Sequence, residues 1–184
     1  MRARAVAQPV VEAGLRDPSG EGPLLRFVQR LIALRHRHPV FCRRRWFQGR
    51  PIHGTNVSDI AWFTPSATEM SEQDWQMGFA KSLGVFLNGR AIPTPNERGE
   101  RIHDESFYVM FHAGHEPLEF TLPNHEFGSE WQVIIDTAIE YEPFIDEGDG
   151  PIHGAGATFT VEPWSLVLLQ RTGWQETPAK KPKP

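Results

Sequence analysis

A chain of 184 residues can bury a sizeable core, but a complete (β/α)₈ barrel needs about 250 residues and does not fit. The 19 basic and 23 acidic residues leave a net charge of −4, so no overall positive field favours nucleic acid. No apolar run approaches the roughly 18 residues that cross a bilayer, and a single cysteine, Cys42, fits a reducing compartment. We expect a soluble, cytoplasmic protein that binds neither nucleic acid nor a membrane.

The N-terminal segment, residues 1–22, shows no sustained hydrophobic period and contains several turn residues. Gln8, Pro9 and Glu12 interrupt its short apolar stretch before a signal-peptide core can form. We therefore expect a flexible leader. At the other end, residues 172–184 are polar and finish in alternating Lys and Pro, which predicts a disordered tail.

One segment has a clear helical period. Pro23 stands where a first helical residue is favoured, Arg35 to His38 place positive charge in the last turn, and Pro39 ends the helix. The apolar stripe of this helix consists of Leu24, Phe27, Val28, Leu31, Ile32 and Leu34. So short an element is not a domain, and the stripe needs a partner outside the helix.

After Pro39 the pattern changes to short runs with a period of two. Strands are predicted at 59–64, 82–88, 106–112, 118–122, 131–136, 157–161 and 165–170. Residues 114–117 predict a tight hairpin loop, and residues 138–156 a long acidic loop rich in glycine. Ser71 caps a predicted helical turn at Glu72–Trp75. Short strands at this spacing favour a mainly β fold, an antiparallel Greek-key β-sandwich preceded by one amphipathic helix.

A series of motifs then points to a family. In chain order they are Leu31–Phe41, Arg43–Arg50, Asp59–Trp62, Glu69-Met70, Asp74-Trp75, Ser82–Gly89, Asp104–Phe107, Trp131, Asp136-Thr137 and Trp164–Leu169. This series resembles the C-terminal portion of bacterial glycogen debranching enzymes, the isoamylase-like, glycogen-operon branch of the α-amylase glycoside hydrolase family. The resemblance covers residues 24–171 and departs from the family at His112, where an asparagine is usual.

The resemblance implies a domain order and a role. Residues 23–54 are expected to be the last helix of a (β/α)₈ barrel with its linker, and residues 55–171 the C-terminal β-sandwich. The parent enzyme hydrolyses α-1,6 branches of glycogen or limit dextrin, and this portion packs on the catalytic barrel through the helix stripe. The family's catalytic carboxylates lie upstream, so the chain alone is expected to be inactive. Without the barrel, we expect the helix to fold onto its own sandwich or to mediate self-association.

Chemical sites within the chain have weaker support. Asp104 and Glu105 are adjacent and point to opposite faces of a strand, so no catalytic carboxylate pair is expected. His36 and His38 diverge around a helix, and neither a metal site nor a cofactor is predicted. The tetrapeptide Pro-Ile-His-Gly recurs at 51–54 and 151–154, which we interpret as turn chemistry. The cluster Arg43, Arg44, Arg45 and Arg50 is expected to pair with acids on the barrel, phosphate binding being the alternative.

The aromatic residues leave a second function open. Most of them lie in alternating strands, where core packing is expected: Trp62, Phe86, Phe111, Trp131 and Trp164. Trp46 and Trp75 lie in loops. The alternative hypothesis is therefore a non-catalytic α-glucan-binding module, with Trp75 and the loop 138–156 as its contacts.

Overall fold

The computed structural model describes residues 22–50, 57–78, 81–140, 142–146 and 148–172. The expected leader and tail lie almost wholly outside these residues, as does the first Pro-Ile-His-Gly tetrapeptide. The helices are α1 (Pro23–Arg37), the 3₁₀ helix η1 (Pro39–Phe41) and α2 (Glu72–Trp75). The strands are β1 (Ile60–Phe63), β2 (Ser82–Leu87), β3 (Phe107–His112), β4 (Leu118–Thr121), β5 (Glu130–Asp136), β6 (Ile152–Gly154), β7 (Thr158–Val161) and β8 (Ser165–Thr172).

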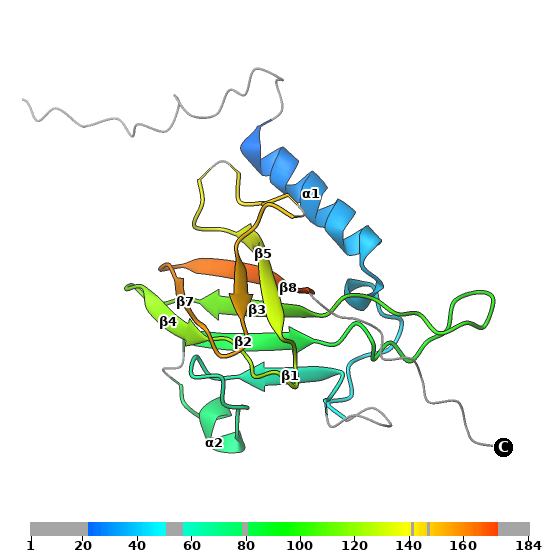
Figure 1. Ribbon diagram of the computed structural model, residues 1–184. Coiled ribbons are helices and arrows are strands. Elements are labelled where there is room, and N and C mark those ends of the chain that lie inside the picture. The colour runs from blue at the N-terminus through cyan, green and yellow to red at the C-terminus, as the bar shows by residue number, and fades with distance from the viewer. Residues whose placement is uncertain (1–21, 51–56, 79–80, 141, 147, 173–184) are drawn as a thin grey trace, which may run out of the picture.

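The strands form two antiparallel sheets (Figure 1). The larger sheet has six strands in the order β1-β2-β3-β8-β5-β6, and the smaller one pairs β4 with β7. Strand β8 lies between β3 and β5, which are far from it in the sequence, as Greek-key connections require. The predicted mainly β, antiparallel sandwich preceded by one amphipathic helix is confirmed.

The predicted hairpin at residues 114–117 is wrong. β3 pairs with β2 and β8, whereas β4 pairs with β7, so residues 114–117 carry the chain from one sheet to the other. Phe120 of β4 is fully buried against the larger sheet, and this burial decides where β4 lies. A short apolar strand shows which of its faces is buried but not which strand lies beside it.

The prediction of a strandless loop at residues 138–156 is also wrong. Strand β6 lies within it and pairs with β5 at the edge of the larger sheet. Its residues Ile152, His153 and Gly154 are largely exposed and have no apolar alternation, so the period-two signal is missing. The pairing is possible because Gly150 brings the backbone close to Val133, where a β-carbon would overlap the carbonyl oxygen.

The larger sheet has an apolar core on each face. One core lies between the two sheets and is built around Tyr108, Phe86, Phe120 and Trp131, all fully buried. The other core lies on the opposite face, where α1 and η1 cover part of the sheet. Leu83, Val85 and Leu87 of β2 belong to this second core, as their alternation predicts.

Candidate functional site

Helix α1 packs on the sandwich through one side only. The Phe27 and Phe144 rings lie 5.5 Å apart, and Leu34 also joins the core of that sheet face. The Arg30 guanidinium stacks on the Phe144 ring at 4.8 Å, pairs with Asp146 at 2.7 Å, and also contacts Glu142. The helix therefore folds onto its own sandwich through part of the predicted stripe.

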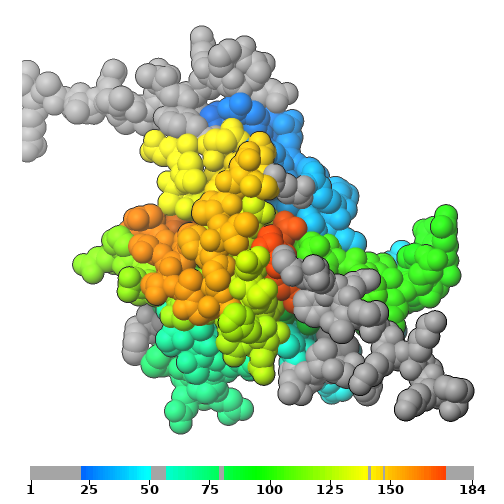
Figure 2. Space-filling model, in the orientation of Figure 1, coloured from blue at the N-terminus to red at the C-terminus, as the bar shows by residue number. Residues whose placement is uncertain are grey.

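The rest of the stripe faces away from the sandwich. We call Leu24, Leu25, Val28, Leu31 and Ile32 the outer face of α1. Their exposed fractions run from 37% at Leu31 to 73% at Leu24. At 100° per residue these five side chains span about 120° of the helix, beside the direction of Phe27 and Leu34. Figure 2 shows α1 (blue) along the border of the molecule. The helix thus has two apolar sides, of which the fold covers one.

A buried polar joint holds the end of α1 on the sheet. His38 Nδ1 lies 2.8 Å from Asp104 Oδ1, and the Val40 N–H donates to Asp104 Oδ2 at 2.9 Å. The His38 and Asp104 side chains are only 7% and 6% exposed. The His38 ring also stands edge-on to Phe107 of β3 at 4.8 Å. This joint fixes the position of the helix relative to the larger sheet.

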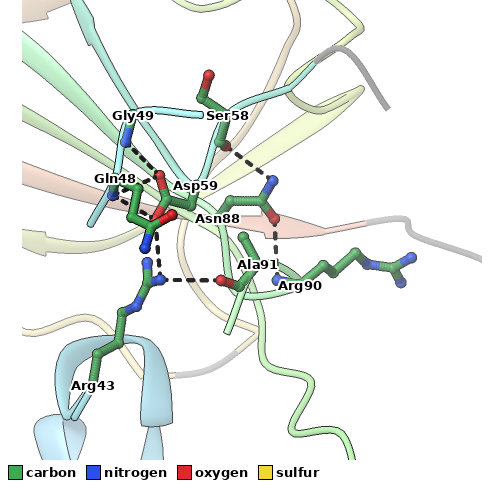
Figure 3. Close-up of polar contacts among 8 residues, drawn as sticks. All are labelled: Arg43, Gln48, Gly49, Ser58, Asp59, Asn88, Arg90 and Ala91. Atoms are coloured by element: carbon green, nitrogen blue, oxygen red, sulfur yellow. Dashed lines mark hydrogen bonds and ion pairs between the residues drawn. The ribbon is translucent and has the colours of Figure 1, made fainter. Parts of the chain in front are cut away.

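A second joint holds the linker that follows η1 (Figure 3). The buried Asp59 carboxylate accepts hydrogen bonds from the Gln48 N–H at 3.0 Å, the Gly49 N–H at 2.9 Å and the Arg43 guanidinium at 3.1 Å. Arg43 also donates to the Ala91 carbonyl, so one guanidinium ties the linker to two loops of the sandwich. The expectation that Arg43 pairs with an acid outside this chain is corrected, because its carboxylate partner is Asp59.

Trp75 lies on α2 and is 52% exposed. Its ring stands edge-on to Trp62 of β1, with centroids 5.3 Å apart and planes at 77°. Core packing is confirmed for Phe86 and Trp131, which are fully buried. The prediction of core packing is wrong for three aromatic residues that are exposed, Trp62, Phe111 and Trp164. Trp62 is exposed because β1 is an edge strand, so its outward residue has a neighbouring strand on one side only.

Among the residues that the structure describes, three ionisable groups have shifted pKa values with identifiable causes. The Ser71 hydroxyl donates to Asp74 at 2.7 Å, and together with the Ser71 N–H it lowers the pKa of Asp74. Burial raises the pKa of Tyr108 well above its usual value. Burial, aided by repulsion from Arg90, lowers the pKa of Arg171 to about 10. Each shift comes from packing or capping, and none occurs in a group of converging catalytic side chains.

Four of the described acids make structural contacts. Asp59 pairs with Arg43, and Asp104 pairs with His38. Glu142 and Asp146 both contact Arg30 rather than facing each other across a cleft. Within the described residues, no cluster of three or more His, Cys, Asp or Glu side chains could hold a metal ion. Nor does any helix there have the length and apolarity needed to span a membrane.

Comparison with known proteins identifies a family and several relatives. Residues 59–170 match the family model described as isoamylase, C-terminal. The glycogen operon protein GlgX homologs of Mycobacterium bovis and Mycobacterium tuberculosis are each 42% identical over 150 residues, which is 81% of this chain and 20% of either relative. The chain therefore spans about a fifth of the length of these relatives.

Among solved structures, the pullulanase type I of Bacillus subtilis, crystallised with maltose, is similar with a TM-score of 0.47. The two chains share 19% identity over 81% of this chain and 15% of the pullulanase. The family model covers more than half of the chain. The chain belongs to the isoamylase C-terminal domain family.

Proposed function

We propose that this chain is the C-terminal β-sandwich domain of a glycogen debranching enzyme and that it packs on a catalytic (β/α)₈ barrel. The enzyme would hydrolyse α-1,6 branches of glycogen or limit dextrin, in line with the glycogen operon named for the mycobacterial relatives. In this proposal residues 23–54 are the last barrel helix with its linker, and residues 55–171 are the sandwich. The exposed thiol of Cys42 fits a cytoplasmic setting.

The outer face of α1 carries this proposal. Burying a Leu, Ile or Val side chain stabilises a protein by about 1.5–3 kcal/mol, so five exposed ones on one helix are a large unused contact. Surfaces of this kind mark sites of association with another protein or domain. A helix with the sandwich on one side and a barrel on the other would bury both of its apolar sides.

The two polar joints support a docking role, because they fix the outer face rigidly relative to the sheet. His38–Asp104 anchors the end of α1, and Asp59 anchors the linker that follows. A rigid helix loses little conformational entropy when it binds. The sandwich would therefore present α1 to the barrel in a preset orientation.

The proposal also assigns the bond-breaking carboxylates to the barrel. A glycosidase needs two carboxyl groups about 5–10 Å apart on either side of the scissile bond. The described acids with the least solvent exposure, Asp59 and Asp104, are already occupied by several hydrogen bonds each. We expect that the purified chain releases no reducing ends from glycogen, and debranching by the chain alone would contradict this assignment.

Binding to a barrel can be measured directly. The mycobacterial GlgX homolog, shortened by its matching region, would be mixed with the chain and followed by sedimentation velocity. We expect complex formation with the natural chain and its loss in the double variant Val28→Glu/Ile32→Glu. Gln29→Glu adds charge on an exposed, polar position of the same helix and is the matched control. Equal binding by all three chains would exclude the outer face as the contact.

A further inference from the structure

We infer that Trp62 and Trp75 together form a binding platform for glucose rings of an α-glucan chain. The inference rests on the proposed function for the identity of the ligand, but it concerns a different surface. The two indoles lie 5.3 Å apart at an angle of 77°, and the two residues are 37% and 52% exposed. The edge-to-face pair thus forms a corner in which each residue keeps more than a third of its surface exposed.

The backbone holds both indoles in place before any ligand arrives. Trp62 lies opposite Val85 in the β1–β2 ladder, and its carbonyl accepts a hydrogen bond from the Met70 N–H at 2.8 Å. The segment after β1 therefore folds back along the strand. Trp75 follows a reciprocal capping box between Ser71 and Asp74 that fixes α2. A platform mounted in this way loses little entropy on binding.

The surrounding chemistry favours a neutral, hydroxyl-rich ligand. Residues 57–78 contain four acids, of which Asp59 is buried, and no Lys, Arg or His. This charge disfavours phosphates, nucleic acids and acidic peptides. The exposed Glu72, Gln73 and Gln76 beside Trp75 offer acceptors and donors to sugar hydroxyls. The indole faces offer an apolar surface to the C–H faces of the sugar rings.

The platform lies away from the outer face of α1. Strand β1 is at one edge of the larger sheet, whereas Phe144, on which α1 packs, bridges to Ile135 of β5, four strands along. At about 4.8 Å per strand this separation is roughly 19 Å. Figures 1 and 2 show α1 and α2 at opposite ends of the molecule. A barrel seated on the outer face would leave the corner free to hold a distant part of a branched glucan.

Affinity electrophoresis of the full chain in gels with and without glycogen tests the inference. We expect glycogen to retard the natural chain and maltoheptaose to reverse the retardation. Trp75→Ala and Trp62→Ala should each weaken binding roughly two- to tenfold, the range set by one aromatic contact. Trp164→Ala and Trp46→Ala remove indoles that are 65% and 92% exposed elsewhere, and they should migrate like the natural chain.

Two further variants separate binding from folding. Trp75→Phe keeps an aromatic wall on the exposed α2, so it should retain most of the retardation that Trp75→Ala loses. Near-ultraviolet circular dichroism identifies any variant that has unfolded, and only folded variants are compared. Unchanged retardation in folded Trp75→Ala and Trp75→Phe would overturn the inference.

The remaining outcomes also decide against the platform. If glycogen does not retard the natural chain, the corner does not bind glucan. If Trp75→Ala abolishes self-association in sedimentation and leaves glycogen binding unchanged, the corner is a contact between copies of the chain. Neither result bears on the barrel-docking proposal. That proposal depends on Val28 and Ile32, and its test measures binding to the shortened GlgX homolog in a separate mixture.

Discussion

His38 and Asp104 connect the only long helix of the described residues to the sheet behind it. Their side chains meet at 2.8 Å with less than a tenth of either exposed, and Asp104 also accepts the Val40 N–H. The Asp104 carboxylate thus pairs with Nδ1 of the helix-cap imidazole and accepts a hydrogen bond from the backbone of η1. The joint explains why the helix and the sandwich act as one body in the proposed docking.

Replacement of Asp104 by alanine is expected to destabilise the chain by about 2–4 kcal/mol. The substitution leaves the Val40 N–H and the His38 Nδ1 buried without their acceptor. Urea denaturation followed by circular dichroism measures this change. Asp146→Ala is the matched control, because it removes a carboxylate that also pairs with a basic side chain but is 79% exposed. The control should cost less than about 1 kcal/mol, and equal losses in the two variants would contradict a buried joint.

Replacement of Asp59 by alanine should cost still more, about 3–5 kcal/mol. The Arg43 side chain is only 4% exposed, so losing Asp59 leaves a buried positive charge without its counter-charge. Two backbone donors, at Gln48 and Gly49, lose their acceptor as well. Asp59→Asn keeps an acceptor but not the charge, and an intermediate loss is expected in the same urea measurement. Stability unchanged in both variants would show that the linker is not anchored here.

The sequence predicted well those elements whose signals are local. Pro23 and Pro39 bracket α1, and the Ser71 cap with Asp74 three residues later marks α2. Both helices form where these signals place them. The alternation of Leu83, Val85 and Leu87 likewise identified the buried side of β2. In each case the deciding contacts lie within a few residues of one another.

Features set by distant residues were missed. Asp59 and Asp104 gave no signal of their role, because their partners lie at sequence separations of 16 and 66. The exposure of Trp62 depends on β1 being an edge strand, and the pairing of β4 depends on β7, some forty residues later. Composition and periodicity describe the faces of an element, whereas its neighbours follow only from the assembled fold.

Alkaline pH should destabilise the chain through Tyr108. Burial raises the folded-state pKa of Tyr108, so the folded chain keeps a proton that the unfolded chain releases near pH 10. The contribution of Tyr108 to the free energy of unfolding is therefore fully present below pH 10. Above pH 10 it falls by up to about 1.4 kcal/mol per pH unit. Tyr108→Phe abolishes this decline, and urea denaturation between pH 8 and about pH 11 measures the difference.

Tyr108→Phe must be compared with the natural chain over the same pH range, because Arg171 also makes stability depend on pH there. Its pKa is lowered to about 10 by burial, so above that pH the unfolded chain binds more protons at this site and stability rises. Both chains contain Arg171, and their difference isolates Tyr108. At neutral pH Tyr108→Phe should be neutral or stabilising, because the buried hydroxyl has no hydrogen-bond partner in the structure. Identical alkaline curves would contradict the buried phenol.

A close approach between Gly84 and Tyr108 predicts a coupled pair of substitutions. A β-carbon at Gly84 would overlap the Tyr108 hydroxyl and lie 2.6 Å from its ring carbon Cζ. Gly84→Ala is therefore expected to destabilise the chain by about 1–3 kcal/mol. Adding Tyr108→Phe removes the hydroxyl but not the ring, so it should restore part of this loss.

Four urea curves complete a double-mutant cycle, and we expect a coupling energy of about 1 kcal/mol. Gly154→Ala on β6 is the control, since a β-carbon at Gly154 would have nothing within 4 Å, and the stability of this variant should change little. Strict additivity of Gly84→Ala and Tyr108→Phe would mean that the phenol does not lie over β2. A coupling energy close to the expected value would place the Tyr108 hydroxyl against Gly84, the one glycine of β2.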